Sequence, residues 1–222
     1  MVKQENKFIA VEANIGAGKS TLLPKLVDAL NQFDIVTPFK WEQIQEPLDD
    51  PEFLRLLDVF YANPNSTEAR LDFQMYITER RSRLVKDLPR NVNYVIERSL
   101  FSDIIFSQAN MLSMECPTGE YLKYFYNIKS RLEEYPFVEA CVYLKTNPYI
   151  SYDRMVSRGR ESEMSMPVSY MRDIHLYHEA CLPQICREYG SRLLTYEWDT
   201  FGDEFAIAQS ILENLKECRL PY

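Results

Sequence analysis

Short runs of β-branched and aromatic residues alternate along this chain with longer stretches in which apolar residues recur at helical spacing. The runs are "FIAVEA" from residue 8, "IVTPFKW" from 35, "NYVIE" from 93, "ACVYLK" from 140 and "LLTYEW" from 193. Strands that alternate with helices predict a parallel sheet covered by helices on both faces. The pattern therefore indicates an α/β fold with a five-stranded parallel sheet.

The longest helical pattern covers residues 67–88. Its apolar stripe consists of Phe73, Ile77, Leu84 and Leu88. Arg81 lies within this stripe, and Gln74 lies seven residues before it, so both side chains leave the helix on nearly the same side. A polar pair beside an apolar stripe suits a planar, hydrogen-bonding ligand such as a nucleobase. The alternative is a pair of surface residues bound to their neighbours.

Composition narrows the class of protein. The 222 residues fit one domain spanning residues 1–222, and the net charge of −8 opposes binding to a nucleic-acid backbone. No segment approaches the roughly 18 apolar residues of a membrane span, and the polar start predicts no signal peptide, so we expect a cytoplasmic protein. The five cysteines are scattered and odd in number, which favours reduced core thiols over disulfides or a zinc site.

The segment "ANIGAGKS" at 13–20 matches the phosphate-binding Walker A pattern except at its first position, where Ala13 replaces glycine. A predicted strand precedes it and a predicted helix follows. Backbone N–H groups of such a loop bind phosphate oxygens, Lys19 adds a positive charge, and the Ser20 hydroxyl is placed to bind Mg²⁺. Ala13 fits if its φ stays negative. The alternative is a small-residue turn that caps a helix, and the missing NKxD segment excludes a GTPase switch.

Two predicted strand ends carry carboxylates, Glu46 in "QIQEP" and Glu97 in "VIERS". Open α/β sheets bind ligands beyond the carboxyl ends of their strands, so both side chains should face the crevice beside the phosphate loop. Arg98 follows Glu97 directly, and leaving either charge buried without a partner would be costly. A structural ion pair at a strand terminus is the alternative interpretation.

Three arginines, Arg154, Arg158 and Arg160, occur within seven positions of an otherwise acidic chain. The first two share a helix face, and the third follows Gly159, a candidate hinge. Mobile arginines that close over a phosphoryl group stabilise its charge and exclude water. We therefore predict a lid at about residues 154–166, against the alternative of a solvated, charged helix face.

These features together resemble the deoxyribonucleoside kinases related to deoxycytidine, deoxyguanosine and deoxyadenosine kinase. The resemblance covers residues 8–205 and rests on "EANIGAGKST" at 12, "EP" at 46, "FYANP" at 60, "FQ" at 73, "ERSLFSD" at 97, "RGRESE" at 158 and "LYHEACL" at 176. It implies a P-loop kinase fold, usually homodimeric, that transfers phosphate from ATP to the 5′-hydroxyl of a deoxynucleoside in nucleotide salvage. The departures are Ala13 and a longer segment between Tyr61 and Gln74.

The resemblance also implies roles at the reacting centre. Glu46 would contact the 5′-hydroxyl as the base, and Glu97 would assist Mg²⁺ together with Ser20. Family members also give Glu97 the role of base, so the sequence leaves open which carboxylate takes the proton. Arg98 would hold the acceptor oxygen and the phosphate, and Arg158 would act with it in catalysis.

On the donor side, the resemblance implies a set of ATP-binding residues from the phosphate loop, the lid and the "GDEF" segment. They are Asn14, Ile15, Gly16, Ala17, Gly18, Lys19, Ser20, Thr21, Arg154, Arg158, Arg160, Asp203 and Phe205. On the acceptor side, Tyr61 and Glu163 would bind the sugar 3′-hydroxyl and Gln74 the base edge. The base slot would be lined by Leu57, Phe60 and Phe73.

Arg81 and Asp103 bear on the choice of base. Arg81 needs an anion nearby, and Asp103 resembles the residue that supplies it in family members that use cytosine and purines. An ionised carboxylate accepts hydrogen bonds and cannot donate them, so it favours an exocyclic amino group and repels the thymine O4 carbonyl. We expect deoxycytidine, deoxyadenosine or deoxyguanosine to be preferred over thymidine.

Two other functions are open at this stage. A nucleoside monophosphate kinase of the thymidylate kinase type would need additional positive charge in the acceptor pocket, whereas Gln74, Tyr61 and Glu163 suit an uncharged sugar. A kinase fold can also persist as a non-catalytic assembly subunit. The residues that argue against such a subunit are Lys19, Glu46, Glu97, Arg158 and Glu163.

Overall fold

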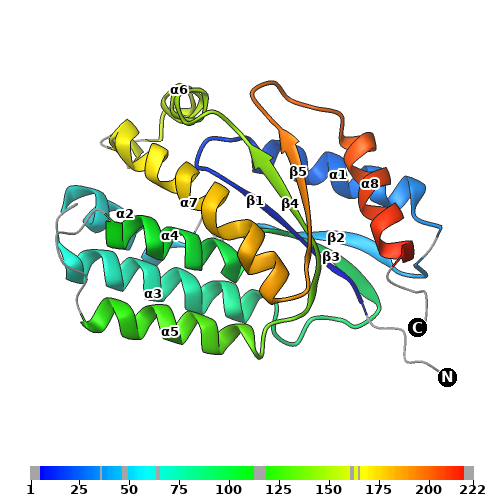
Figure 1. The fold of residues 1–222 in the computed structure, drawn as a ribbon, viewed down its shortest axis with the longest axis horizontal. Helices are drawn as coiled ribbons and strands as arrows, with labels where there is room; N and C mark the ends of the chain where they lie inside the picture. Colours follow the sequence, from blue (N-terminus) through cyan, green and yellow to red (C-terminus); the bar gives the residue numbers. More distant parts are fainter. Residues whose placement is uncertain are drawn as a thin grey trace.

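A computed structural model describes residues 6–35, 37–46, 50–63, 66–112, 119–160, 163–164 and 166–217. Within them, five strands form one parallel sheet in the order β2-β3-β1-β4-β5 (Figure 1). The strands are β1 (Phe8–Ala13), β2 (Lys40–Ile44), β3 (Val92–Glu97), β4 (Val138–Lys145) and β5 (Arg192–Glu197). The predicted five-stranded parallel sheet is therefore confirmed.

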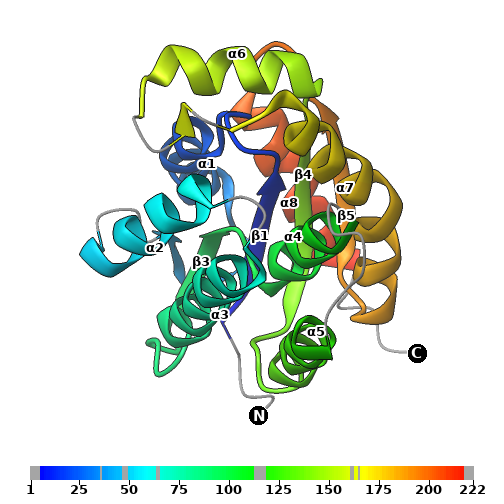
Figure 2. The ribbon, with the colours of Figure 1, turned by 90° about the vertical axis from the view of Figure 1, so that its left-hand side faces the viewer.

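Helices cover both faces of this sheet. They are α1 (Lys19–Phe33), α2 (Pro51–Ala62), α3 (Thr67–Leu84), α4 (Leu100–Leu112), α5 (Gly119–Leu132), α6 (Pro148–Arg158), α7 (Val168–Glu188) and α8 (Glu204–Glu217). Helices α1 and α8 pack on one face, and α4, α5 and α7 pack on the other. Helix α3 packs against α4 and α5, α2 packs on α3, and α6 crosses beyond the carboxyl ends of the strands (Figure 2).

The central strand β1 explains why its sequence reads as an unbroken apolar run. Ile9 and Val11 belong to the core beneath α1 and α8, whereas Ala10 belongs to the core beneath α4, α5 and α7. Successive side chains of a strand point to opposite faces, so a strand covered on both sides is apolar at every position. Glu12 is the polar exception in this strand and is fully buried.

The second strand was predicted too early in the sequence, since β2 begins only near the end of the run that starts at residue 35. The backbone N–H of Thr37 donates to Asp34 at 2.9 Å, and Asn93 donates to the Thr37 hydroxyl at 2.7 Å. Pro38 has no N–H group to give to a strand ladder. Side chains therefore hold this stretch as a turn that leads into β2.

The long helix predicted for residues 67–88 ends at Leu84, so its predicted end was wrong. Asp87 has a φ of 60°, which lies in the left-handed region and is incompatible with a continuing helix. Leu88 precedes Pro89, and the residue before proline disfavours helical geometry. Gln74 and Arg81 nevertheless lie within α3, as the sequence predicted.

None of the described helices is both long enough and apolar enough to cross a bilayer.

Candidate active site

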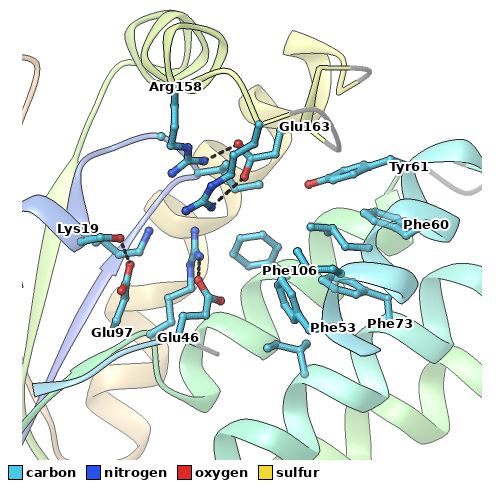
Figure 3. Close-up of a pocket in the computed structure, with 18 of the residues that line it drawn as sticks. Lys19, Glu46, Phe53, Phe60, Tyr61, Phe73, Glu97, Phe106, Arg158 and Glu163 are labelled. Atoms are coloured by element: carbon cyan, nitrogen blue, oxygen red, sulfur yellow. Dashed lines mark hydrogen bonds and ion pairs between the residues drawn. The ribbon is translucent and has the colours of Figure 1, made fainter. Parts of the chain in front are cut away.

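A cavity of about 430 Å³ lies beyond the carboxyl ends of the central strands. The loop after β1, the ends of β2 and β3, and the facing sides of α2, α3 and α6 contribute to its lining (Figure 3). The phosphate loop lies at one side of this cavity and the aromatic side chains of α2 and α3 lie at the other. Donor and acceptor groups can therefore meet within one cavity.

The loop between β1 and α1 has the geometry that its small residues predicted. Gly16 has a φ of 75°, and a Cβ atom there would lie 2.2 Å from the carbonyl oxygen of Ser151. Gly18 has a φ of 101°, and a Cβ atom there would lie 2.5 Å from the ring of Phe201. Both positions therefore require glycine. Ala13 is the last residue of β1 and is not among the described non-glycine residues with positive φ, so the absent first glycine costs no backbone strain.

Lys19 begins α1, where backbone N–H groups and the helix dipole favour a bound anion. Its side chain is buried, and Nζ donates to the carbonyl oxygen of Asn14 at 3.2 Å. Burial, reinforced by the charge of Arg98, lowers the Lys19 pKa to about 7, although Glu97 and Glu46 oppose the shift. A phosphate arriving at this loop would restore the lysine's positive charge.

Ser20 and Glu97 lie together at the edge of the phosphate loop. The Ser20 hydroxyl donates to Glu97 Oε1 at 2.7 Å, and the Glu97 side chain is buried. Both side chains offer hard oxygen ligands. In enzymes that bind phosphate substrates, Mg²⁺ commonly binds one or two protein oxygens together with the substrate phosphates. The pair therefore fits Mg²⁺. In the part of the chain that the structure describes, no cluster of three or more His, Cys, Asp or Glu residues could hold a metal alone.

Glu46 lies beside two arginines between the phosphate loop and the aromatic side chains (Figure 3). Arg98 Nη1 contacts Glu46 Oε2 at 2.7 Å, and Arg81 pairs with both Glu46 and Asp103. Burial alone would raise the Glu46 pKa, but Arg98, Arg81 and Lys19 outweigh it and lower the value to about 2. Glu46 is therefore ionised at neutral pH.

The ion pair between Arg81 and Asp103 is the one expected from the sequence. Asp103 is fully buried, and burial raises its pKa to about 6 despite the opposing effect of Arg81. The second contact of Arg81, to Glu46, was not predicted. It connects the residues expected to select the base with the residues expected at the reacting hydroxyl.

Aromatic side chains line the side of the cavity away from the phosphate loop. The rings of Phe60 and Phe73 are stacked with centroids 5.6 Å apart, and Gln74 lies beside them in the lining. Leu57 and Tyr61 line the same region, as the sequence predicted. Two stacked rings with an amide at the edge can bind a planar heterocycle.

Several cavity residues were not predicted as site residues. They are Phe53, Leu54, Ile77, Phe106, Tyr170 and Phe201. Phe53 could have been found from its spacing, because it precedes Leu57 by one helical turn on the buried face of α2. Phe106, Tyr170 and Phe201 come from separate elements and reach the cavity only through tertiary packing.

The three clustered arginines differ in their surroundings. Arg154 donates to the carbonyl oxygens of Ala17 at 3.2 Å, Trp198 at 3.1 Å and Asp199 at 2.6 Å. Its guanidinium also lies 4.5 Å from the centroid of the Phe201 ring. Arg154 is therefore fixed against the phosphate loop and the end of β5.

Arg158 and Arg160 instead pair with Glu163. Arg158 Nη2 contacts Glu163 Oε2 at 2.5 Å, and Arg160 Nη1 lies 3.5 Å from Glu163 Oε1. Gly159 caps the end of α6 with a φ of 69°, so the helix ends between the two arginines. Both arginines and Glu163 line the cavity, and Figure 3 shows Arg158 and Glu163 on the side away from Glu46 and Glu97.

Five predicted site residues lie outside the cavity lining, four of them on the donor side and one, the fully buried Asp103, on the base side. Asn14 and Ala17 support the loop from behind, and Asn14 donates to the carbonyl oxygen of Met171 at 2.8 Å. Asp203 accepts from the Phe205 N–H at 2.9 Å, and the Phe205 ring packs on Phe33. The predicted loop residues that do line the cavity are Ile15, Gly16, Gly18, Lys19, Ser20 and Thr21.

Comparison with known proteins identifies the family. The model of the family described as deoxynucleoside kinase matches residues 9–217, nearly the whole chain. The chain belongs to the deoxynucleoside kinase family. This kinase phosphorylates deoxynucleosides.

Individual relatives agree with that membership. A Fowlpox virus protein named "Probable deoxycytidine kinase" is 31% identical to this kinase over 224 residues, covering 96% of this chain and 88% of the relative. Deoxyguanosine kinase of Dictyostelium discoideum is 27% identical over 208 residues, covering 91% and 67%. A solved structure of deoxyadenosine kinase from M. mycoides has a TM-score of 0.73 at 20% identity, covering 96% of this chain and all of that one, which supports the fold.

Proposed function

We propose that this kinase transfers the γ-phosphoryl group of ATP to the 5′-hydroxyl of a deoxynucleoside, with Mg²⁺, in nucleotide salvage. The observation that carries the proposal is the single cavity in which the phosphate loop and the stacked aromatic slot lie on opposite sides of Glu46 and Arg98. A nucleoside whose base occupies the slot would direct its 5′-carbon toward these two residues. Residues 1–222 would then form one kinase domain.

The decisive experiment measures transfer from radiolabelled ATP to each of the four deoxynucleosides and to their monophosphates. Deoxynucleosides should become labelled, because the acceptor side of the cavity presents Tyr61, Gln74 and Glu163, which suit an uncharged sugar and a base. Transfer to monophosphates alone would refute the proposal in favour of a monophosphate kinase.

The arrangement suggests a division of roles at the reacting centre. Both oxygens of Glu46 are held by arginines and its pKa is about 2, so it serves as a hydrogen-bond acceptor that orients the 5′-hydroxyl rather than as a strong base. In a loose phosphoryl-transfer transition state the hydroxyl proton leaves late, which makes a weak base sufficient. Arg98 would neutralise charge on the transferred group, and Lys19 would bind the donor phosphates.

Ser20 and Glu97 would hold Mg²⁺, which when bound neutralises phosphate charge. The carboxylate of Glu97 is free of arginine partners within the described residues and accepts only the Ser20 hydroxyl, so it is available as a ligand. Tyr61 and Glu163 would bind the sugar 3′-hydroxyl from the lid side of the cavity. Asp203 and Phe205 would contact the adenine from outside the lining described above.

We further propose that the kinase is a homodimer. Helices α5 and α7 expose large apolar side chains, among them Leu122, Tyr126 and Leu176, which are 44%, 67% and 56% accessible. Exposed apolar groups of this size are typical of protein–protein contacts. Light scattering of the purified kinase would measure the mass, and a monomer at assay concentration would contradict this assembly.

Arg158 is expected to act on the transition state. Its guanidinium lines the cavity and is held by Glu163 on the lid side, so Arg158→Ala should lower kcat much more than it raises the KM for the nucleoside. Steady-state kinetics with both substrates would measure the two constants. Arg172→Ala, which removes an exposed arginine from α7, is the matched control. An unchanged kcat with weaker nucleoside binding would place Arg158 in the acceptor pocket.

Substrate preference is expected to depend on Arg81 and Asp103. We propose that deoxycytidine, deoxyadenosine or deoxyguanosine is used in preference to thymidine, because an ionised Asp103 repels the thymine O4 and Arg81 crowds the methyl group. The double variant Arg81→Met with Asp103→Ala should improve thymidine use more than either single variant. Each single substitution removes one partner from a buried ion pair and leaves the other charge behind.

Competition assays at equal concentrations of the four nucleosides would test this preference. Arg83→Met is a suitable control, because Arg83 lies on the same helix and pairs with Glu79 at the surface. A wild-type kcat/KM that is highest for thymidine would refute the assignment. So would a double variant that gains no more thymidine activity than the better single variant.

A further inference from the structure

Glu12 is a fully buried carboxylate in β1 that does not line the cavity. It accepts three hydrogen bonds, from the Ser99 N–H at 2.8 Å, from the Ser99 hydroxyl at 2.7 Å and from the Ser102 hydroxyl. In the described part of the chain no lysine or arginine forms an ion pair with it. All three donors are neutral and belong to the corner that joins β3 to α4, so Glu12 ties that corner to the central strand.

The same corner contains Arg98, whose backbone is strained. Its φ is 59°, in the left-handed region that non-glycine residues rarely adopt unless their surroundings enforce it. The Arg98 N–H donates to the carbonyl oxygen of Val11 at 3.1 Å, so β1 holds the corner just before Arg98. Glu12, the next residue of β1, holds Ser99 just after it. The two contacts fix the Arg98 backbone from both sides.

This backbone conformation directs the Arg98 side chain into the cavity. The guanidinium reaches Glu46 at 2.7 Å and lies 5.1 Å from the centroid of the Phe106 ring. If the corner relaxed to an ordinary negative φ, the Cα–Cβ direction would change and these contacts would be lost. The position of the guanidinium therefore depends on what holds Ser99.

Glu12 also determines where α4 begins. The Ser99 hydroxyl that donates to Glu12 accepts in turn from the Phe101 N–H at 3.1 Å, which caps the first turn of the helix. The Ser102 hydroxyl adds a second attachment within the first turn of α4. Asp103 and Phe106, which contact Arg81 and Arg98, both lie on this helix.

We infer that Glu12 is a positioning residue for phosphoryl transfer, which holds Arg98 in its left-handed conformation by hydrogen bonding to the Ser99–Ser102 corner. The inference rests on the role proposed above for Arg98. Its effect comes from the geometry of the acceptor atoms, so a neutral side chain with the same acceptors should replace Glu12.

Two substitutions separate geometry from charge. Glu12→Gln keeps the shape, retains one oxygen for both Ser99 donors and offers an N–H to the Ser102 hydroxyl, which can turn to accept it. This variant should keep kcat within about threefold of wild type, since every hydrogen bond has a replacement. Glu12→Ala removes all acceptors and should lower kcat by about 10²-fold with little change in nucleoside KM, as expected when a catalytic group is displaced.

If Glu12→Ala does not fold, two less disruptive variants still test the inference. Ser99→Ala removes one hydroxyl from the corner and should lower kcat by about tenfold through a smaller displacement of Arg98. Ser107→Ala is its matched control, because Ser107 is equally buried on α4 and its hydroxyl donates only to the carbonyl oxygen of Ile104 within the same helix, at 2.8 Å. Thermal unfolding of each variant shows that the kinase assayed is folded.

The decisive readout is a double-mutant cycle with Arg98→Ala. If Glu12 acts through Arg98, Glu12→Ala should cause little further loss of kcat once Arg98 is absent. Additive losses would overturn the inference, and so would a Gln variant as impaired as the Ala variant or equal kcat values for Ser99→Ala and Ser107→Ala. A wild-type protein that phosphorylates no deoxynucleoside would instead contradict the proposed function, so the two failures are distinguishable.

Discussion

Replacing Glu97 with glutamine is expected to lower kcat by about 10²-fold to 10³-fold while leaving the fold intact. Glutamine has nearly the same shape, so the packing at the end of β3 is preserved. The substitution removes the negative charge that accepts the Ser20 hydroxyl at 2.7 Å and that acts to raise the Lys19 pKa. It also replaces a charged oxygen ligand for Mg²⁺ with a neutral one, so half-maximal activity should need more Mg²⁺.

Initial rates at saturating ATP, measured over a range of Mg²⁺ concentrations, would test this expectation. Glu42→Gln provides the control, because Glu42 lies on the neighbouring strand β2 with its side chain exposed to solvent. Near wild-type turnover of Glu97→Gln at saturating ATP and Mg²⁺ would show that the carboxylate has neither of the assigned roles.

The second large effect is expected for Lys19→Ala, which should lower turnover by about 10²-fold or more. Lys19 is buried at the start of α1 and donates to a loop carbonyl oxygen at 3.2 Å. Its removal deletes the positive charge that faces the donor phosphates. The free energy of unfolding should not fall, because a buried and poorly solvated cation contributes little to stability.

The same lysine predicts a pH dependence of nucleotide binding. Burial and then Arg98 lower the Lys19 pKa to about 7, so the free kinase loses this charge as the pH rises through neutrality. Binding of ATP to the wild type should therefore weaken from the acidic to the alkaline side of pH 7, and Lys19→Ala should lack this change. Binding titrations across that range would measure it, with Lys25→Ala as an exposed control on the same helix. Identical pH profiles for all three proteins would contradict the assignment.

The fold and the donor loop could be predicted because their signals are local. Five apolar runs gave the sheet, and the loop at 13–20 showed its glycines at the two positions where the structure requires positive φ. The presence of Glu46 and Glu97 in one cavity followed from a rule about parallel sheets, because the carboxyl ends of parallel strands lie along the same edge. Each of these inferences needs only neighbouring residues or a fixed topology.

The remaining features depend on contacts between distant segments. Arg81 contacts Glu46 across 35 positions, and Glu12 reaches Ser99 across 87 positions. The periodicity of the sequence does not predict which of many carboxylates will form an ion pair with a given arginine. The errors at the start of β2 and the end of α3 have a related cause, because the hydrogen bonds of Thr37 to Asp34 and from Asn93, and the left-handed Asp87, outweigh the apolar pattern.

Because Glu46 pairs with both Arg81 and Arg98, one of the two arginines can leave it when a phosphate binds. Arg98 can exchange its carboxylate partner for a phosphoryl oxygen, while Arg81 stays on Glu46 and remains anchored by Asp103. A buried charge that loses its only partner is strongly destabilising, and here neither the arginine nor the carboxylate is ever left in that state. Arg81 thus serves as a second counter-ion of Glu46, which keeps this carboxylate paired while Arg98 changes partners.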